Sequence, residues 1–153
     1  MKVVFLDIDG VLNSEDYVYS CREYGIAIDP TRMVLLKQII DETNAKIVLS
    51  TSWREHWEKA PNECGKIGLQ INNIFSQYNL EILDKTPNLR TRREQEIWYW
   101  LNKNPQVKNF VVLDDMFLYA EFLNGHFIKT SNRFDGLDEA DVEKAIEILS
   151  EGD

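Results

Sequence analysis

Three short apolar runs recur along the chain, and each of them leads into polar residues. Residues 2–6 read KVVFL, residues 46–50 read KIVLS and residues 109–113 read NFVVL. Runs of this length that are rich in β-branched and aromatic side chains are typical of strands buried on both faces. The polar residues that follow are acidic in the first and third cases and form an STS cluster in the second. The pattern predicts a parallel sheet with a ligand site along the edge where these strands end.

Helical patterns separate the apolar runs. Asp29 and Pro30 form a good N-cap and first-turn pair. The apolar positions that follow them at helical spacing are Met33, Leu36, Ile39 and Ile40. Residues 91–103 predict a second helix, opened by Thr91 with Glu94 three residues later, as in a capping box. The apolar face expected for this helix comprises Ile97, Trp98 and Leu101.

The last third of the chain continues the alternation. A helix is predicted near residues 116–124 and a strand over residues 126–130. Asp138 then caps a final helix, whose apolar face comprises Val142, Ala145, Ile146 and Leu149. Alternating strands and helices imply right-handed crossovers. The expected fold class is therefore α/β, with a Rossmann-like, doubly wound and mainly parallel sheet flanked by helices.

Two stretches interrupt this scheme. Residues 13–28 are polar and aromatic and leave room only for a flap. Residues 55–88 are longer, mixed in character and punctuated by proline and glycine, and we expect them to form a modest insertion. The chain of 153 residues contains no internal repeat or interdomain linker, which predicts a single domain over residues 1–153.

The charge balance narrows the range of partners. The formal net charge is −9. Because an acidic chain repels phosphate backbones at long range, broad binding of nucleic acid is not expected. A small phosphorylated substrate, or a nucleic-acid end held locally by arginines, is compatible with this charge.

The apolar pattern and the cysteines predict a cytoplasmic protein. The apolar stretch after Lys2 breaks at Asp7, so the hydrophobic region of a signal peptide is missing, and no segment is apolar enough to span a membrane. Cys21 and Cys64 lack metal-binding spacing and are interpreted as free thiols of a reducing compartment.

Asp7 and Asp9 give the first chemical signal. Their carboxylates lie two residues apart where the first strand ends, and two such charges would repel each other. A hard divalent cation such as Mg²⁺ would resolve the conflict, because it prefers oxygen ligands. Gly10 permits a close ligand approach that a larger residue would block. An Asp-Gly turn is the alternative interpretation of this stretch alone.

The stretch DIDGV, residues 7–11, resembles the first motif, DxDx(T/V), of the haloacid dehalogenase-like (HAD) hydrolase superfamily. The resemblance implies that Asp7 is a nucleophile that forms an aspartyl-phosphate. It also implies that Asp9 protonates the leaving group and then activates water, with Mg²⁺ as the cofactor. A carboxylate that attacks beside a neighbour that supplies the proton is consistent with both roles.

The second motif of the superfamily ends a strand with a serine or threonine that holds a phosphoryl oxygen. IVLSTSWRE, residues 47–55, is similar to it. Alignment of the strand ends favours Thr51, whereas the S-x-R arrangement of polynucleotide-phosphatase relatives favours Ser52 with Arg54. Both hydroxyls remain candidates, with Ser50 less favoured, and a helix cap is the alternative role for them. Arg54 is expected to bind phosphate with two hydrogen bonds, or else to form a salt bridge.

The third motif supplies a cation that steadies the transferring phosphoryl group, and most members use lysine. The corresponding stretch here is RTRREQEI, residues 90–97. Arg93 fits best and Arg92 second, and Lys85 is a further candidate. A cation at a helix N-terminus opposes the helix dipole, which favours a functional role over a stabilising one.

The fourth motif is an acidic pair at the end of a strand, and FVVLDDM, residues 110–116, resembles it. The implied Mg²⁺ site comprises Asp7, the Asp9 backbone carbonyl and Asp114. Asp115 would bind the metal directly or through a water molecule.

The resemblance covers residues 3 to about 140 and is similar in detail to small HAD domains associated with RNA-repair proteins, through STSWRE, REQEI, LDD and GLDEA. Because members of this family select substrates largely through cap insertions, the resemblance implies a phosphatase with a minimal cap, whose open site suits nucleic-acid ends or phosphoproteins. Several aromatic residues are expected near the mouth of the active site, where they either pack within the protein or stack on a base of the substrate. They are Tyr17, Tyr19, Tyr24, Trp53 and Trp57. The alternatives are a small-metabolite or nucleotide phosphatase closed by residues 55–88 and a non-catalytic binding or regulatory module.

Overall fold

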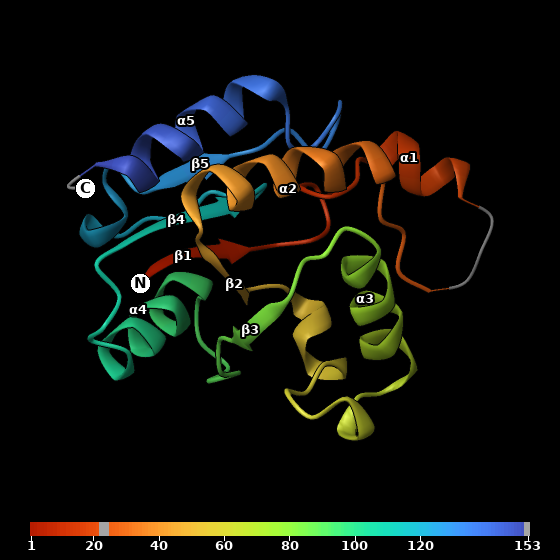
Figure 1. Ribbon diagram of the computed structural model, residues 1–153, viewed down its shortest axis with the longest axis horizontal. Coiled ribbons are helices and arrows are strands. Elements are labelled where there is room, and N and C mark those ends of the chain that lie inside the picture. Colours follow the sequence, from red (N-terminus) through yellow and green to blue (C-terminus); the bar gives the residue numbers. More distant parts are fainter. Residues whose placement is uncertain (22–24, 152–153) are drawn as a thin grey trace.

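A parallel sheet forms the centre of the computed structural model, which describes residues 1–21 and 25–151. Its five strands follow the order β3-β2-β1-β4-β5, and every neighbouring pair is parallel. The strands are β1 (Lys2–Leu6), β2 (Lys46–Leu49), β3 (Ile82–Lys85), β4 (Asn109–Asp114) and β5 (Phe127–Lys129). Figure 1 shows α2 and α5 together on one side of the sheet and α4 on the other. The predicted doubly wound α/β fold is confirmed.

Helices and short turns connect the strands. The helices are α1 (Glu15–Ser20), α2 (Pro30–Thr43), α3 (Lys66–Gln77), α4 (Arg93–Lys103) and α5 (Glu139–Ser150). The 3₁₀ turns are η1 (Ser52–His56), η2 (Pro61–Glu63) and η3 (Glu121–Leu123). Among the residues that the structure describes, no helix has the combination of length and apolar character that crossing a membrane requires.

The two faces of the sheet bury separate apolar clusters. Val4 and Leu6 of β1 join the cluster that lies against α2, α3 and α5. Val3 and Phe5, which alternate with them, join the cluster that lies against α4. Burial on both faces explains why the central strands read as continuous apolar runs.

Two predicted helix starts are confirmed. The Asp29 carboxylate accepts a hydrogen bond from the Thr31 N–H at 2.9 Å, and Pro30 is the first residue of α2. Asp138 and Asp141 form a reciprocal capping box at the start of α5. Both caps satisfy backbone N–H groups that the first helical turn leaves without partners.

The start of α4 differs from the prediction. The helix begins at Arg93, and its N-cap, Arg92, makes no side-chain capping bond. The predicted capping box of Thr91 and Glu94 is therefore wrong. Trp98, which was expected on the apolar face, is 51% exposed. The buried positions of the helix are Glu94, Glu96, Ile97 and Trp100.

The helix predicted near residues 116–124 is wrong as well. The Asp114 carboxylate accepts the N–H of Met116 at 2.9 Å, and this local bond turns the chain directly after β4. Leu118 and Leu123 are the buried apolar anchors of the segment. Their spacing of five residues does not match one face of a helix, and only the short turn η3 forms.

Residues 55–88 carry more structure than a modest insertion. Helix α3 buries Ile71 and Phe75 in the main core, and β3 extends the sheet beside β2. Gly68 lets α3 approach η1, because a Cβ at this position would lie 2.0 Å from the His56 carbonyl oxygen. The segment is therefore an integral part of the fold.

Candidate active site

The carboxyl ends of β1, β2 and β4 meet at one edge of the sheet. Leu6 of β1 pairs with Leu49 on one side and with Leu113 on the other. The backbone N–H of Asp7 donates to the Leu113 carbonyl at 3.0 Å. The N–H of Ser50 donates to the Leu6 carbonyl at 2.8 Å. These bonds continue the ladder past the strands and bring three of the predicted motifs together.

A buried guanidinium joins the aspartates of two strands. Arg93, the first residue of α4, places Nη1 3.0 Å from Asp7 Oδ2 and 2.6 Å from Asp114 Oδ2. The Arg93 side chain is 14% exposed, and both carboxylates are less exposed than that. The structure thus brings the candidate nucleophile, the candidate metal ligand and the candidate cation into one cluster.

The other candidate cations have different partners. Lys85 Nζ donates to two backbone carbonyls at the end of η1 and lies 2.7 Å from a Glu58 carboxylate oxygen. Arg92 is largely exposed and pairs with Glu94 at 3.2 Å. Within the described part of the chain, Arg93 is the one of these three cations that contacts Asp7.

Asp9 is exposed, and its carboxylate is held at both oxygens. Asn13 Nδ2 donates to Oδ1 at 2.9 Å, and Trp53 Nε1 donates to Oδ2 at 2.7 Å. Gly10, the next residue, has φ +80, and a Cβ there would lie 2.5 Å from Asp115 Cγ. The predicted need for glycine in this turn therefore has two physical causes, the backbone angle and the approach of the acidic pair.

Asn13 is part of the site although no motif identifies it. Its Oδ1 accepts the N–H of Gly10 at 2.8 Å, and its Nδ2 donates to the Ala27 carbonyl at 2.7 Å in addition to Asp9. One side chain thus connects the turn after β1 to the flap. The signal in the sequence is a single asparagine that follows the apolar residues after Gly10.

The aromatic residues expected at the mouth of the active site differ in burial and in hydrogen bonding. Trp57 is buried in the core. The Tyr17 hydroxyl donates to a backbone carbonyl of the flap at 3.2 Å. Tyr19 is exposed, and Tyr24 lies outside the described residues. Trp53 binds Asp9 through its indole N–H, an interaction that the sequence did not indicate.

The candidate hydroxyls have different surroundings. Thr51 is fully buried, and its hydroxyl accepts the N–H of Trp53 at 3.4 Å and lowers the pKa of the nearby Asp7 carboxyl. Ser52 is exposed and lines a hollow together with Arg93. Ser50 Oγ is buried and has no hydrogen-bond partner among the described residues. Thr51 therefore lies near the candidate nucleophile, whereas Ser52 faces the space beside the candidate cation.

Arg54 is part of a buried ion pair. Its Nη2 lies 2.6 Å from Glu96 Oε2, and its Nη1 donates to the Thr51 carbonyl at 3.0 Å. The other oxygen of Glu96 accepts the N–H of Leu89 at 2.9 Å. The pair joins η1 to α4. A phosphate contact by Arg54 would compete with Glu96 for the same guanidinium.

A comparison with protein families identifies the family of the chain. The family of the HAD domain in Swiss Army Knife RNA repair proteins matches residues 3–142. The chain belongs to this family. No match was found among curated proteins or among solved structures. The resemblance inferred from the sequence motifs is thereby confirmed.

The HAD domain offers an acidic cluster that fits a divalent cation. Ligand oxygens of Asp7, Asp114 and Asp115 all lie within 4.8 Å of one another. When the three carboxylates are ionised, Arg93 compensates one of their charges and leaves two uncompensated. Uncompensated buried charge is unfavourable, and carboxylate oxygens are preferred ligands of Mg²⁺. The residues therefore fit a divalent metal ion in charge and in ligand type.

The electrostatics of the HAD domain follow from this excess of negative charge. Burial raises the pKa of the Asp7 carboxyl from 3.8 to about 7, against the opposing influence of Arg93 and with a further increase from Asp114. Burial also raises the pKa of Asp114, again against Arg93. A divalent cation beside these carboxylates would lower both pKa values, because it favours their ionised forms.

Without divalent metal, the HAD domain is expected to lose stability between about pH 4 and pH 7 because of Asp7. The pKa of Asp7 in the folded state, about 7, exceeds the ordinary value of 3.8. The folded state therefore binds the proton more tightly, so this contribution is complete below about pH 4 and is lost as the pH rises through about 7. It amounts to roughly 2–4 kcal/mol in the free energy of unfolding.

Urea unfolding in EDTA at a series of pH values measures this effect. The difference in unfolding free energy between Asp7→Asn and the wild type should shift in favour of the variant across this window. A difference that stays constant from about pH 4 to pH 8 would contradict the raised pKa of Asp7.

Proposed function

We propose that this HAD domain is a Mg²⁺-dependent phosphatase that hydrolyses phosphomonoesters through an aspartyl-phosphate on Asp7. One observation carries the proposal: the Asp7 carboxylate lies beside Arg93, at 3.0 Å, and within the acidic cluster of Asp114 and Asp115. A buried carboxylate that has a cation and potential metal ligands around it suits attack on a phosphoryl group.

In the first step a carboxylate oxygen of Asp7 attacks phosphorus, and the bond from phosphorus to the ester oxygen breaks. Asp9 donates its proton to the departing oxygen. In the second step Asp9 takes a proton from water as the water oxygen attacks phosphorus, which releases inorganic phosphate and restores Asp7. When bound, Mg²⁺ would offset the negative charge of the substrate oxygens beside the carboxylates.

The remaining side chains would hold the transferring group. Arg93 would bind its oxygens, because its guanidinium already faces the attacking carboxylate. Thr51 would orient the Asp7 carboxylate through its hydroxyl, and Ser52 would reach the phosphoryl oxygens from the exposed side. Asn13 and Trp53 would keep the Asp9 carboxylate directed to the solvent side, where the leaving group departs.

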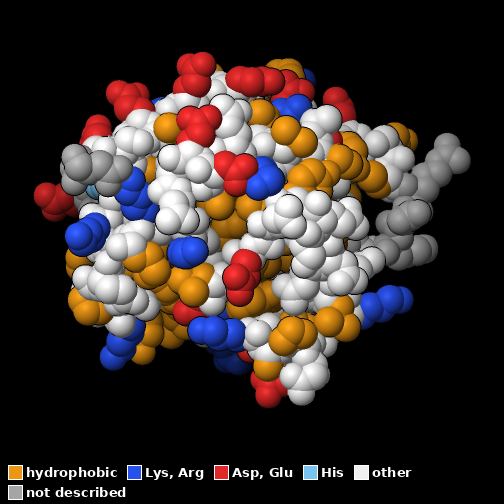
Figure 2. Space-filling model, viewed as in Figure 1, with side chains coloured by type: hydrophobic (Ala, Val, Ile, Leu, Met, Phe, Trp, Pro, Cys, Tyr) orange, Lys and Arg blue, Asp and Glu red, His pale blue; other side chains and the backbone are white. Residues whose placement is uncertain are grey.

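The preferred substrate in this proposal is the phosphorylated end of an oligonucleotide. The family name refers to RNA repair, and the short stretch of residues 13–28 leaves room in the sequence for only a flap over the site. The acidity of the chain does not oppose such a substrate locally. Figure 2 shows Asp and Glu side chains gathered along the edge formed by α5, whereas Lys and Arg side chains are more frequent toward α4. Arg90, Arg92 and Arg93 precede or begin α4.

Hydrolysis of p-nitrophenyl phosphate should depend on Mg²⁺ and fall to background in EDTA, because the carboxylates alone repel a phosphate dianion. Activity should return when excess Mg²⁺ is added. A colorimetric assay of p-nitrophenol measures both effects. Full activity in EDTA would contradict the metal dependence.

The substrate class is tested with a panel of 3′- and 5′-phosphorylated oligonucleotides, nucleotides, sugar phosphates and phosphopeptides. Phosphorylated oligonucleotides are expected to give the highest kcat/KM. Turnover of small metabolites alone would overturn the proposed substrate but keep the phosphatase. Absence of hydrolysis across the panel with Mg²⁺ present would overturn the phosphatase itself.

A further inference from the structure

Exposed aromatic side chains gather beside the candidate active site. Trp98 of α4 is 51% exposed, and Phe117 and Tyr119 of the segment after β4 are 67% and 71% exposed. The rings of Phe117 and Tyr119 are nearly parallel, with an interplanar angle of 12° and centroids 6.1 Å apart. Large exposed apolar groups that cluster in this way mark binding surfaces more often than isolated ones do.

Two adjoining hollows connect these aromatic residues to Arg93. The first hollow, of about 460 Å³, is lined by Arg93 and Ser52 together with Phe117 and Tyr119. The second, of about 520 Å³, has Trp98 on its wall and shares Tyr119 with the first. The second hollow also shares Arg92 and Glu94 with the first. We call the two hollows together the aromatic cleft. The cleft begins at the cation that contacts Asp7 and leads away from the catalytic cluster.

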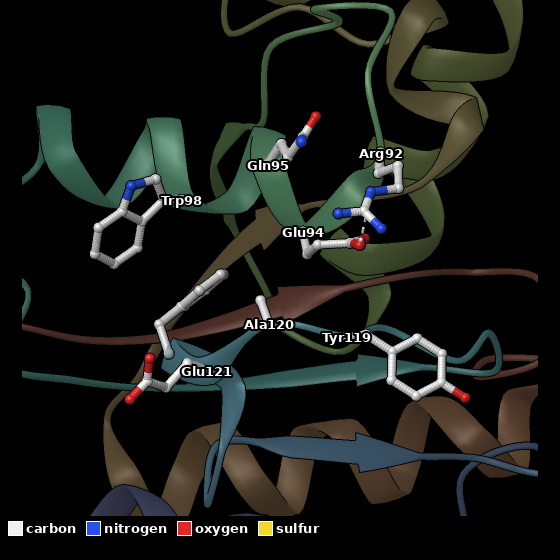
Figure 3. A pocket seen from close by; sticks show the side chains of 8 residues that line it. Arg92, Glu94, Gln95, Trp98, Tyr119, Ala120 and Glu121 are labelled. Carbon is white, nitrogen blue, oxygen red and sulfur yellow. Dashed lines mark ion pairs between the residues drawn. The ribbon is translucent and has the colours of Figure 1, made fainter.

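The chemistry of the second hollow favours an uncharged planar group. Figure 3 shows Trp98 reaching in from α4, with Tyr119 and Glu121 on the opposite side from the segment after β4. Arg92 is paired with Glu94, as the dashed line in Figure 3 marks. The carboxylate of Glu121 is also on the wall, so a phosphate would be repelled there. Phosphate therefore fits the Arg93 end, and an aromatic ring system fits the Trp98 end.

We infer that the aromatic cleft binds a nucleobase of the strand whose terminal phosphate is hydrolysed at Asp7. The inference rests on the proposed function and deepens it by naming the form of the substrate. A base can enter the cleft and stack on Tyr119 or Trp98 only when it is free of a complementary strand. The enzyme accordingly selects single-stranded ends over paired ends.

Continuity with the catalytic cluster favours this occupant over a protein partner. Arg93 belongs both to the cluster around Asp7 and to the lining of the cleft, so a ligand that fills the cleft approaches the reacting phosphate. A third hollow, outside the aromatic cleft, is lined by Asp9, Trp53 and Tyr19 on the flap side. It offers the alternative position for the base, and the test below separates the two.

The test compares a phosphorylated single-stranded oligoribonucleotide with p-nitrophenyl phosphate. Trp98→Ala and Tyr119→Ala should each lower the ratio of the two kcat/KM values about tenfold, the factor expected for one lost base–aromatic stack. Tyr99→Ala is the matched control, because Tyr99 is an exposed aromatic residue of the same helix that lines neither hollow of the cleft. Annealing the oligoribonucleotide to its complement should lower kcat/KM of the wild type by a similar factor.

Three kinetic results would overturn the inference. The first is an unchanged ratio of the two kcat/KM values in both variants. The second is equal turnover of single-stranded and paired ends. The third is a fall of that ratio in Tyr19→Ala but not in Tyr119→Ala. Quenching of tryptophan fluorescence by the unphosphorylated oligoribonucleotide gives an independent readout. Binding that is lost in Tyr119→Ala supports the cleft even when no substrate is hydrolysed, and in that case only the phosphatase proposal fails. Absence of binding together with dimer formation that Tyr119→Ala abolishes would instead identify the cleft as a contact between copies of the chain.

Discussion

Asp7→Asn is expected to lower kcat for phosphomonoester hydrolysis by roughly four orders of magnitude or more, because the amide cannot form the aspartyl-phosphate. Single-turnover assays with p-nitrophenyl phosphate and Mg²⁺ measure the loss. Acid quench of the wild type during turnover should trap phosphate on the protein, and the same treatment of the variant should trap none.

The loss of activity in Asp7→Asn can be distinguished from a loss of folded protein. The substitution removes a buried carboxyl whose pKa is raised to about 7, so the variant should be at least as stable as the wild type above that pH when no metal is present. Circular dichroism and urea unfolding provide this control. Retention of full activity by a folded Asp7→Asn protein would exclude Asp7 as the nucleophile.

Arg93→Met is expected to lower kcat/KM about 10²–10³-fold, the range for loss of a group that stabilises transition-state charge. The variant should also lose stability in EDTA, by about 3–5 kcal/mol, because the carboxylates of Asp7 and Asp114 remain buried without their guanidinium. Excess Mg²⁺ should recover much of the stability without recovering the activity. Thermal unfolding with and without Mg²⁺, alongside steady-state kinetics, measures both effects.

Two further substitutions make this experiment specific. Arg90→Met removes an exposed arginine near the start of the same helix and should leave the hydrolysis of p-nitrophenyl phosphate and the stability close to those of the wild type. Arg93→Lys keeps a cation, as in most HAD members, and should retain more activity than Arg93→Met. Equal kinetic losses in Arg90→Met and Arg93→Met would rule out a specific role for Arg93.

The sequence predicted the fold well where burial acts on both sides of an element. The runs that became β1, β2 and β4 are apolar at successive positions because each face of the sheet carries its own core cluster. Their polar ends then meet by topology alone, since parallel neighbours finish at the same edge. This is why Asp7 and Asp114 could be grouped from sequence, although they lie 107 positions apart in the chain.

Other features could not be predicted from the apolar pattern. β3 is a four-residue edge strand whose residues are mostly half-buried, so it lacks the continuous apolar run of a central strand. The helix expected near residues 116–124 gives way to a turn because the Asp114 carboxylate binds a local N–H. Arg93 and Lys85 could not be separated from sequence, since only tertiary structure shows which cation faces Asp7.

The side-chain amide of Asn13 links the flap to Asp9. A single NH₂ group bonds both the carboxylate that would carry the proton and the carbonyl of Ala27. A molecule that pushes the backbone at residue 27 therefore moves the anchor of Asp9 as well. The position of the Asp9 carboxylate thus depends on two segments of the chain, the turn after β1 and the backbone at Ala27.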